Sequence, residues 1–336
     1  MKWSADLKSL RRGLRLASKV ACSELGLAWS PPQPASPRVG TVGVKELRLH
    51  GPNPGALRML AYAPATSIRP GGPVVLLLHG CGQRADAFAS DSGWIALADR
   101  LGFPLILPEQ AEANNQGRCF RWFLPFHTAR GSGEAASIVS MVQMATATYG
   151  TDPRQVYVVG LSAGGAMAAA LLASYPDVFA AGAAVGGLPV GAATSSVQAL
   201  MRMAQAGPNR PPEAWADEVR QAGPPGFKGP WPRLSVWSGG EDTVVAPDNA
   251  TLLAAQWRTV HGCSDAPSTD VTTGGVRRRQ WGASGAPAVE LWTLPGLAHG
   301  YPIGDGTGQE APYVLRAPVD ATSRIAAFWR LMENRA

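Results

Sequence analysis

The chain has 336 residues, of which 46% are hydrophobic and 16% are charged. This length and apolar content fit one large α/β domain or two small domains, and they exclude a disulfide-stabilised miniprotein. Glycine (39) and proline (29) are abundant without a collagen-like period, which indicates a loop-rich globular protein. No run of about 18 uncharged apolar residues occurs, so we expect no membrane-spanning helix.

The positive charge lies mostly at the N-terminus. The formal net charge is +6, and residues 1–20 hold six basic residues against one acidic residue, so the remainder is almost neutral. A neutral body does not suit a nucleic-acid groove, and we expect no nucleic-acid partner. Arg15, Lys19 and Glu24 interrupt the apolar run that a signal peptide needs, so we expect a cytoplasmic location.

Residues 1–37 are interpreted as a basic N-terminal arm and a Pro-rich linker, and residues 38–336 as the catalytic domain. In the arm, Leu7, Leu10 and Leu14 share one helical face with basic residues around them. Such a helix packs on the protein surface or associates weakly with an anionic or hydrophobic surface, and both alternatives stay open.

The apolar pattern after residue 38 alternates between short strand-like runs and helical segments. The expected strands are Val44–Leu49, Leu57–Ala63, Val74–Leu78, Phe103–Leu107, Val156–Val159, Val178–Val185, Leu234–Trp237 and Val289–Leu294. The expected helices are Ala85–Leu101, Glu134–Tyr149, Ala163–Ser174, Asn249–Val260 and a terminal helix from about Pro318. This alternation predicts a mostly parallel sheet with helices on both faces. Pro-rich, weakly periodic residues 190–232 are expected to be a small insertion over the active site.

The most informative motif is G-x-S-x-G at residues 160–164, which read GLSAG. An apolar strand precedes it and a helix of small residues follows, as a nucleophile on a sharp strand-to-helix turn requires. Close neighbours of the nucleophile must lack bulk, and the helix N-terminus then points at the developing anion. We therefore predict Ser162 as the nucleophile.

A serine hydroxyl needs a base, and the base needs an orienting acid. In this arrangement the acid and then the histidine follow the serine along the chain. His299 follows the last expected strand and is predicted to be the base, whereas His261 is expected to cap a helix. Asp242 is predicted to be the acid, with its neighbour Glu241 as the main competitor, and Asp248 is expected to cap the next helix.

Two backbone N–H groups are needed to stabilise the oxyanion. The amide of Ala163 is expected to supply one, and the loop at residues 79–83 the other, from Cys81 or, as second choice, Gly82. The His79 side chain is expected to hold this loop. The four cysteines show no zinc spacing, so no metal is expected, and a Cys81–Cys119 bond stays open.

Four segments together resemble the polyhydroxybutyrate depolymerase-type esterases, an α/β-hydrolase family that also includes feruloyl and acetylxylan esterases. They are HGCGQ (79–83), DSGWIALADRLGFPLILP (91–108), CFRWF (119–123) and DPRQVYVVGLSAGGAMA (152–168). The likeness runs from about Arg58 to about Tyr301. It implies an α/β-hydrolase fold, the triad Ser162, Asp242 and His299, and Cys81 as an oxyanion donor. It also suggests that Trp122 borders the substrate cleft, and Gln83 is expected to contact substrate there.

The resemblance implies a serine esterase that works through an acyl-enzyme without a cofactor, on poly(3-hydroxybutyrate) or related 3-hydroxyalkanoate oligomers. A feruloyl, acetylxylan or general short-chain esterase is the alternative. The family pattern carries a polar residue where Gly82 stands and a CWNW-like run where this chain reads CFRW. Hydrolysis of short or amorphous esters is therefore expected more firmly than attack on crystalline polymer. A non-catalytic protein that binds a polymer granule is the alternative from a different class.

Overall fold

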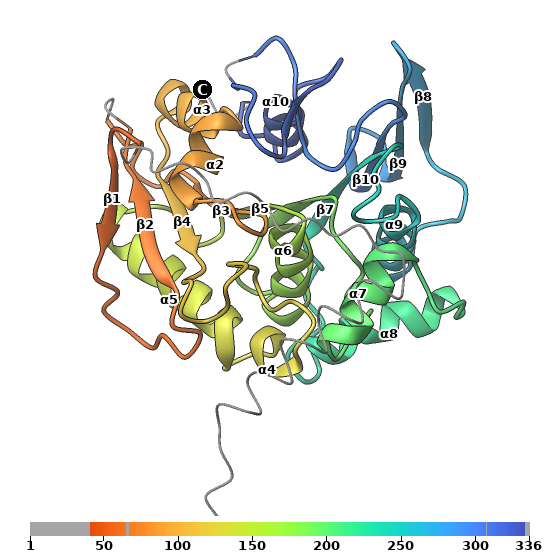
Figure 1. Ribbon diagram of the computed structural model, residues 1–336, viewed down its shortest axis with the longest axis horizontal. Helices are drawn as coiled ribbons and strands as arrows, with labels where there is room; N and C mark the ends of the chain where they lie inside the picture. The colour runs from red at the N-terminus through yellow and green to blue at the C-terminus, as the bar shows by residue number, and fades with distance from the viewer. Residues whose placement is uncertain (1–40, 65–66, 307, 333–336) are drawn as a thin grey trace, which may run out of the picture. The chain divides into compact units, whose positions relative to one another are not determined.

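The computed structural model describes residues 41–64, 67–306 and 308–332 (Figure 1). The arm and linker expected over residues 1–37 lie outside these residues. Within the described ranges, none of the helices combines the length and hydropathy needed to cross a membrane.

A ten-stranded sheet forms the centre of the fold, in the order β1-β2-β4-β3-β5-β6-β7-β10-β9-β8. The six strands from β4 to β10 in this order pair in parallel, and both edges of the sheet are antiparallel. The strands are β1 (Val44–Leu47), β2 (Arg58–Tyr62), β3 (Val74–Leu78), β4 (Leu105–Glu109), β5 (Val156–Leu161), β6 (Ala181–Val185), β7 (Arg233–Gly239), β8 (Thr269–Thr273), β9 (Val276–Ala283) and β10 (Ala286–Leu294). A small parallel pair, β11 (Tyr301–Ile303) and β12 (Val314–Arg316), lies apart from it.

Helices cover both faces of the sheet, as expected for an α/β fold (Figure 1). The helices are α2 (Ala85–Asp91), α3 (Trp94–Leu101), α4 (Pro125–Thr128), α5 (Gly133–Tyr149), α6 (Ala163–Ser174), α7 (Ser196–Ala204), α8 (Pro212–Ala222), α9 (Asp248–Val260) and α10 (Ala321–Phe328). One core joins the sheet to α5, α6, α8 and α9, and a second joins it to α2, α3 and α10. Alternate residues of a strand enter opposite cores, so Leu76 belongs to the first and Leu77 to the second.

Three expected features differ in the structure. The strand expected at Val178–Val185 begins only at Ala181, because the chain turns after α6, where the Val178 amide donates to Tyr175 O (3.0 Å). The single helix expected at Ala85–Leu101 is two helices, because Gly93 between them adopts a left-handed φ of 82°. Helix α9 begins at Asp248 with Pro247 at its N-cap, so the expected cap at Asp248 was wrong by one position. His261 occupies the C-cap of α9 as predicted.

The weakly periodic segment contains two regular helices, α7 and α8. Helix α8 packs in the first core through Ala216 and Val219, so this part belongs to the body of the domain. Helix α7 contacts the loop after β7, where the amide of Ala246 donates to the carbonyl of Met203 (2.8 Å). Within the expected insertion, α7 is thus the helix that has a hydrogen bond to the loop that carries Asp242.

Candidate active site

Ser162 lies on a strained turn between β5 and α6. Its φ of 57° and ψ of −120° fall in a region that non-glycine residues rarely adopt. The turn requires glycines on both sides, because a Cβ would lie 2.1 Å from the Gly164 carbonyl oxygen at Gly160 and 2.2 Å from the Leu78 oxygen at Gly164. The amide of Ser162 donates to Val185 O (2.8 Å), which ties the turn to β6. The G-x-S-x-G spacing therefore has a steric cause in this fold.

Asp242 and His299 form a short buried pair. Nδ1 of His299 lies 2.6 Å from Oδ2 of Asp242. The other carboxylate oxygen of Asp242 accepts the amides of Val244 (2.9 Å) and Val245 (2.7 Å), so the acid is held from both sides. Glu241 is exposed and only its amide is engaged, by Leu297 O. The structure thus brings Asp242, and not Glu241, to the histidine.

Ser162, Asp242 and His299 follow the carboxyl ends of the parallel strands β5, β7 and β10, which lie at one edge of the sheet. Residues 185–186 link the serine to the other two. Val185 binds the Ser162 amide, and a Cβ at Gly186 would lie 3.0 Å from Cε1 of His299 and 3.7 Å from Oδ2 of Asp242. A side chain here would press on the His299 ring, and the φ of 55° also favours glycine, a requirement that the sequence analysis missed.

The loop after β3 leaves one amide available. Gly82 N–H donates to Gly117 O (2.7 Å), and Gln83 N–H donates to Gly80 O (3.2 Å). Gly80 N–H donates to Oε1 of Gln83 (2.8 Å). Among the described residues, the amide of Cys81 has no hydrogen-bond acceptor, which favours it over the second choice, Gly82. Ala163 is the first residue of α6, where backbone amides have no partner within the helix.

His79 holds this loop as expected. Its Nε2 accepts the amide of Gln110 (3.1 Å), so the proton is on Nδ1, which donates to Gly80 O (2.7 Å). Burial lowers the pKa of His79, and the neutral ring matches this pair of bonds. His79 thus serves the shape of the loop, and the structure gives it no contact with Ser162.

The side chain of Gln83 is committed to the backbone at both ends. Its Oε1 accepts from Gly80, and its Nε2 donates to Pro312 O (2.9 Å). A role of Gln83 in substrate binding stays a prediction, since its amide group is already used to join two loops. Trp122 packs edge-to-face on Phe123 (5.5 Å). It also joins a small apolar cluster beside the site with Ala166, Leu188, Met203, Val244 and Val245.

Tyr313 is a neighbour of the site that sequence analysis missed. Its ring packs edge-to-face on the His299 ring with centroids 6.0 Å apart. Its φ of 63° is strained, and the preceding carbonyl, of Pro312, is the one that Gln83 holds. Tyr313 lies outside the sequence motifs, so the sequence alone gave no indication of this contact.

The chain is similar to known esterases in its fold and in its sequence. An acetyl xylan esterase from Aspergillus awamori shares the fold, with a TM-score of 0.74 and 23% identity over 86% of this chain and 99% of the other. A poly(3-hydroxyalkanoate) depolymerase C of Paucimonas lemoignei is 38% identical over 288 residues, 84% of this chain and 69% of the relative. An acetylxylan esterase of Coprinopsis cinerea is 32% identical over 275 residues, 80% of this chain and 72% of the relative. Residues 57–280 match the family model described as esterase PHB depolymerase.

The chain belongs to the PHB depolymerase esterase family. The protein is a carboxylic ester hydrolase with an α/β-hydrolase fold. In this esterase, Cys81 and Cys119 form a disulfide, which answers the question that the sequence left open. The bond joins the loop with the free Cys81 amide to the CFRWF segment that carries Trp122.

A buried carboxylate anchors the same segment of the esterase. Glu134, in the first turn of α5, accepts the amide of Arg121 (2.8 Å) and the side-chain amide of Gln110 (2.7 Å). Burial raises the pKa of Glu134 to about 7, although both hydrogen bonds act in the opposite direction. The described residues contain no group of His, Cys, Asp and Glu side chains that could hold a metal.

We expect Glu134 to make the stability of the esterase depend on pH. Its folded pKa lies above the ordinary value of 4.5, so the folded state favours the protonated acid. The stabilisation is therefore complete below pH 4.5 and is lost as the pH rises through 7, by about 3 kcal/mol. Urea unfolding at several pH values should show this fall in wild type and a flatter dependence in Glu134→Gln. Parallel curves for the two proteins would contradict it.

Replacement of Tyr313 by Ala should loosen the His299 ring and lower kcat/KM by roughly ten- to a hundredfold. Tyr313→Phe keeps the ring and is the matched control, expected to stay near wild type. The pH profile of kcat/KM separates two causes of a lower rate. A displaced His299 ring should change the part of the profile that reports the general base, whereas a general loss of folded protein should lower kcat/KM equally at every pH. An unchanged profile and rate in Tyr313→Ala would show that the contact has no role.

Proposed function

We propose that Ser162, Asp242 and His299 act as a catalytic triad in the hydrolysis of poly(3-hydroxybutyrate) or related 3-hydroxyalkanoate oligomers. The observation that carries the proposal is the 2.6 Å contact between Asp242 and His299, at the sheet edge where Ser162 is held on its strained turn. The alternative substrate class is a feruloyl, acetyl or other short-chain ester, which the same machinery would cleave.

The proposed reaction has two halves. Nε2 of His299 removes the proton of the Ser162 hydroxyl while Oγ attacks the ester carbonyl carbon. The amides of Cys81 and Ala163 bind the resulting oxyanion. The carbon–oxygen bond to the alcohol then breaks, and His299 gives its proton to the leaving alkoxide. Water, deprotonated by His299, then attacks the acyl carbon, the bond from this carbon to Ser162 Oγ breaks, and His299 returns the proton to Oγ as the carboxylic acid leaves.

An apolar surface supports a water-insoluble polyester as substrate. Three large hydrophobic side chains are exposed on α7: Val197 (68%), Leu200 (39%) and Met201 (52%). Near the C-terminal end of α7, Met203 contacts the loop that follows Asp242. Exposed apolar groups beside a site indicate a hydrophobic binding partner. The relative named for poly(3-hydroxyalkanoate) hydrolysis points to the same chemical class.

The first test of function measures p-nitrophenyl esters from acetate to octanoate and the clearing of an amorphous poly(3-hydroxybutyrate) suspension. We expect short-chain hydrolysis and clearing by wild type. Short-chain hydrolysis without clearing would favour the alternative substrate class of feruloyl, acetyl or other short-chain esters. If no ester were hydrolysed, the assignment as an enzyme would be overturned, and a non-catalytic granule-binding protein would be favoured.

The double variant Val197→Asp/Met201→Asp should separate polymer from soluble substrate. Two charges on the exposed face of α7 should reduce clearing of the suspension by roughly tenfold, because each adds a desolvation cost at the polymer surface. Hydrolysis of p-nitrophenyl butyrate should stay near wild type. Val271→Asp, at an exposed valine on β8, is the control. Equal losses on both substrates would refute a polymer-binding role for this face.

The cytoplasmic location expected from residues 1–24 stays a prediction, and the Cys81–Cys119 disulfide argues against it. Disulfides persist in oxidising compartments and are rare in the cytosol. We therefore propose that the protein works in an oxidising compartment. Alkylation of intact cells followed by mass analysis should find Cys263 labelled and Cys81 and Cys119 protected.

Weak surface association of the arm is tested by pelleting with granules after deletion of residues 1–36, and unchanged pelleting would refute it.

A further inference from the structure

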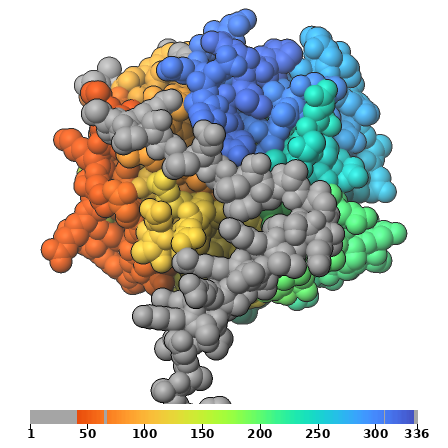
Figure 2. All heavy atoms as spheres, in the orientation of Figure 1, coloured from red at the N-terminus to blue at the C-terminus, as the bar shows by residue number. Residues whose placement is uncertain are grey.

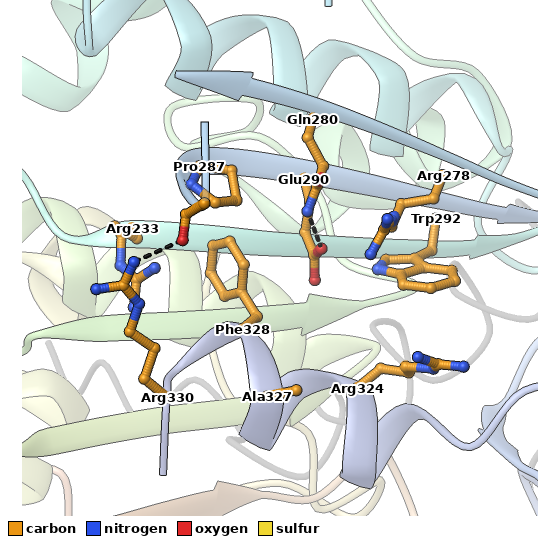
Figure 3. Close-up of a pocket in the computed structure, with 11 residues that line it drawn as sticks. Arg233, Arg278, Gln280, Pro287, Glu290, Trp292, Arg324, Ala327, Phe328 and Arg330 are labelled. Atoms are coloured by element: carbon orange, nitrogen blue, oxygen red, sulfur yellow. Dashed lines mark hydrogen bonds between the residues drawn. The ribbon is translucent and has the colours of Figure 1, made fainter. Parts of the chain in front are cut away.

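A pocket lies between the edge of the sheet and α10, lined by residues from β7, β9, β10 and α10 and by none of the candidate catalytic residues (Figure 3). Its cavity volume is about 210 Å³. A second cavity of about 240 Å³ shares Arg278, Trp292 and Arg324 with it. The pocket and the second cavity together are called the groove below. Figure 2 shows the C-terminal residues (dark blue) beside the hairpin of β8 and β9 (light blue), and these two parts form the walls of the second cavity.

The groove carries an excess of positive charge. Arg278 and Arg324 lie on the Trp292 ring, with their guanidinium carbons 5.4 and 6.0 Å from its centroid. Neither has an ion-pair partner within the described part of the chain. Arg277, next to Arg278 but on the opposite face of β9, is paired with Asp270 (2.6 Å). Figure 3 shows Arg278, Trp292 and Arg324 together at one end of the pocket.

The acidic residue in the lining does not neutralise these arginines through direct contacts. Glu290 is buried and accepts hydrogen bonds from Ser235 (2.7 Å) and Gln280 (3.2 Å). Its burial raises the pKa of the carboxyl, so its negative charge is disfavoured. An anion that enters the groove therefore meets the guanidinium groups of Arg278 and Arg324, while the Glu290 carboxyl is engaged by Ser235 and Gln280.

Trp292 forms a flat wall beside the two arginines. Its side chain is 7% exposed and stacks on Trp237 with centroids 4.6 Å apart and planes 6° apart. The Trp292 side chain also acts on the Glu290 carboxyl, whose pKa it lowers, so its N–H already faces an acceptor of the protein. The ring therefore contributes the surface on which Arg278 and Arg324 lie.

The second cavity combines the shared arginines with a set of apolar side chains. Beside the shared arginines it is lined by Val271, Val276, Pro318 and Val319, with Thr273. An inorganic ion would use the guanidinium groups and leave these carbons uncovered. A carboxylate attached to a short hydrocarbon chain would use both parts of the groove.

We propose that this groove binds a short-chain organic carboxylate, with its carboxylate between Arg278 and Arg324 and its chain against Val276 and Val319. Arginine recognises planar carboxylates in this way. Binding does not depend on the proposed function. Carboxylic acids released by ester hydrolysis belong to this class, so the site would sense product if the proposed function holds.

Isothermal titration calorimetry at constant ionic strength with acetate, butyrate, hexanoate and inorganic phosphate tests the proposal. Affinity should rise from acetate to hexanoate, and hexanoate should bind more tightly than phosphate. Arg278→Gln/Arg324→Gln should weaken hexanoate binding at least tenfold. The matched control Arg277→Gln/Arg220→Gln removes two paired, surface arginines and should bind as wild type.

No saturable binding, or equal affinity for phosphate and hexanoate, would overturn the proposal. So would a double variant that binds hexanoate as wild type does, since the carboxylate would then occupy another site. Arg324→Gln alone, at an exposed position on α10, should still weaken binding several-fold and serves if the double variant folds poorly. Hydrolysis of p-nitrophenyl butyrate by these variants should be unchanged, so loss of this site and failure of the proposed function are separate results.

Discussion

Replacement of Ser162 by Ala is expected to lower kcat/KM for p-nitrophenyl butyrate by at least about 10⁴-fold. The side chain projects from a turn whose strain the surrounding glycines permit, and no other described serine occupies such a turn. The remaining activity would come from the oxyanion amides and from substrate binding, which the substitution leaves in place.

Ser174→Ala is the matched control for this experiment. Ser174 is a buried serine at the other end of α6, and its hydroxyl donates only to Ala170 O (2.8 Å). The control should keep near-wild-type kcat/KM, with a small loss of stability. A Ser162→Ala protein that retained more than about 1% of wild-type activity would exclude Ser162 as the nucleophile.

Replacement of Asp242 by Asn should lower kcat/KM by roughly 10³- to 10⁴-fold. The carboxylate accepts from His299 on one oxygen and from the amides of Val244 and Val245 on the other. An amide nitrogen facing Nδ1 cannot accept its proton, so the ring would take the wrong tautomer, and the imidazolium would lose its counter-charge.

Glu241→Gln tests the competing acid with the same chemical change one residue away. Glu241 is exposed and its side chain takes no part in the contact with His299, so the variant should keep wild-type activity. If Glu241→Gln lost activity and Asp242→Asn kept it, the assignment of the acid would be reversed.

Elements with strong local patterns could be predicted from the sequence. The uninterrupted apolar run at Val74–Leu78 and the small-residue helix at Ala163–Ser174 have the predicted bounds in the structure. Their composition fits one environment, a strand or helix buried on all sides. Ala85–Leu101 was predicted as one helix because its apolar period continues across Gly93, and the left-handed φ of that glycine depends on tertiary contacts that periodicity does not contain.

The candidate site also contains residues that the sequence predicts and residues that only the structure reveals. Ser162 and His299 could be predicted as site residues because each has a distinctive neighbourhood along the chain. The choice between Glu241 and Asp242 needed the structure, since adjacent residues point in different directions and only one reaches His299. Gly186 directly follows β6 and Tyr313 directly precedes β12, and neither belongs to a motif of the sequence, so no spacing rule could find them.

Covalent labelling tests the central claim most directly. The protein is incubated with a p-nitrophenyl alkylphosphonate, which leaves a stable adduct on an activated serine, and is then analysed by intact and peptide mass spectrometry. The account predicts one adduct per chain, on the peptide that contains Ser162, with activity lost in proportion and no adduct in His299→Ala. Labelling at another residue, or full loss of activity without an adduct on Ser162, would contradict the assignment of this serine as the nucleophile.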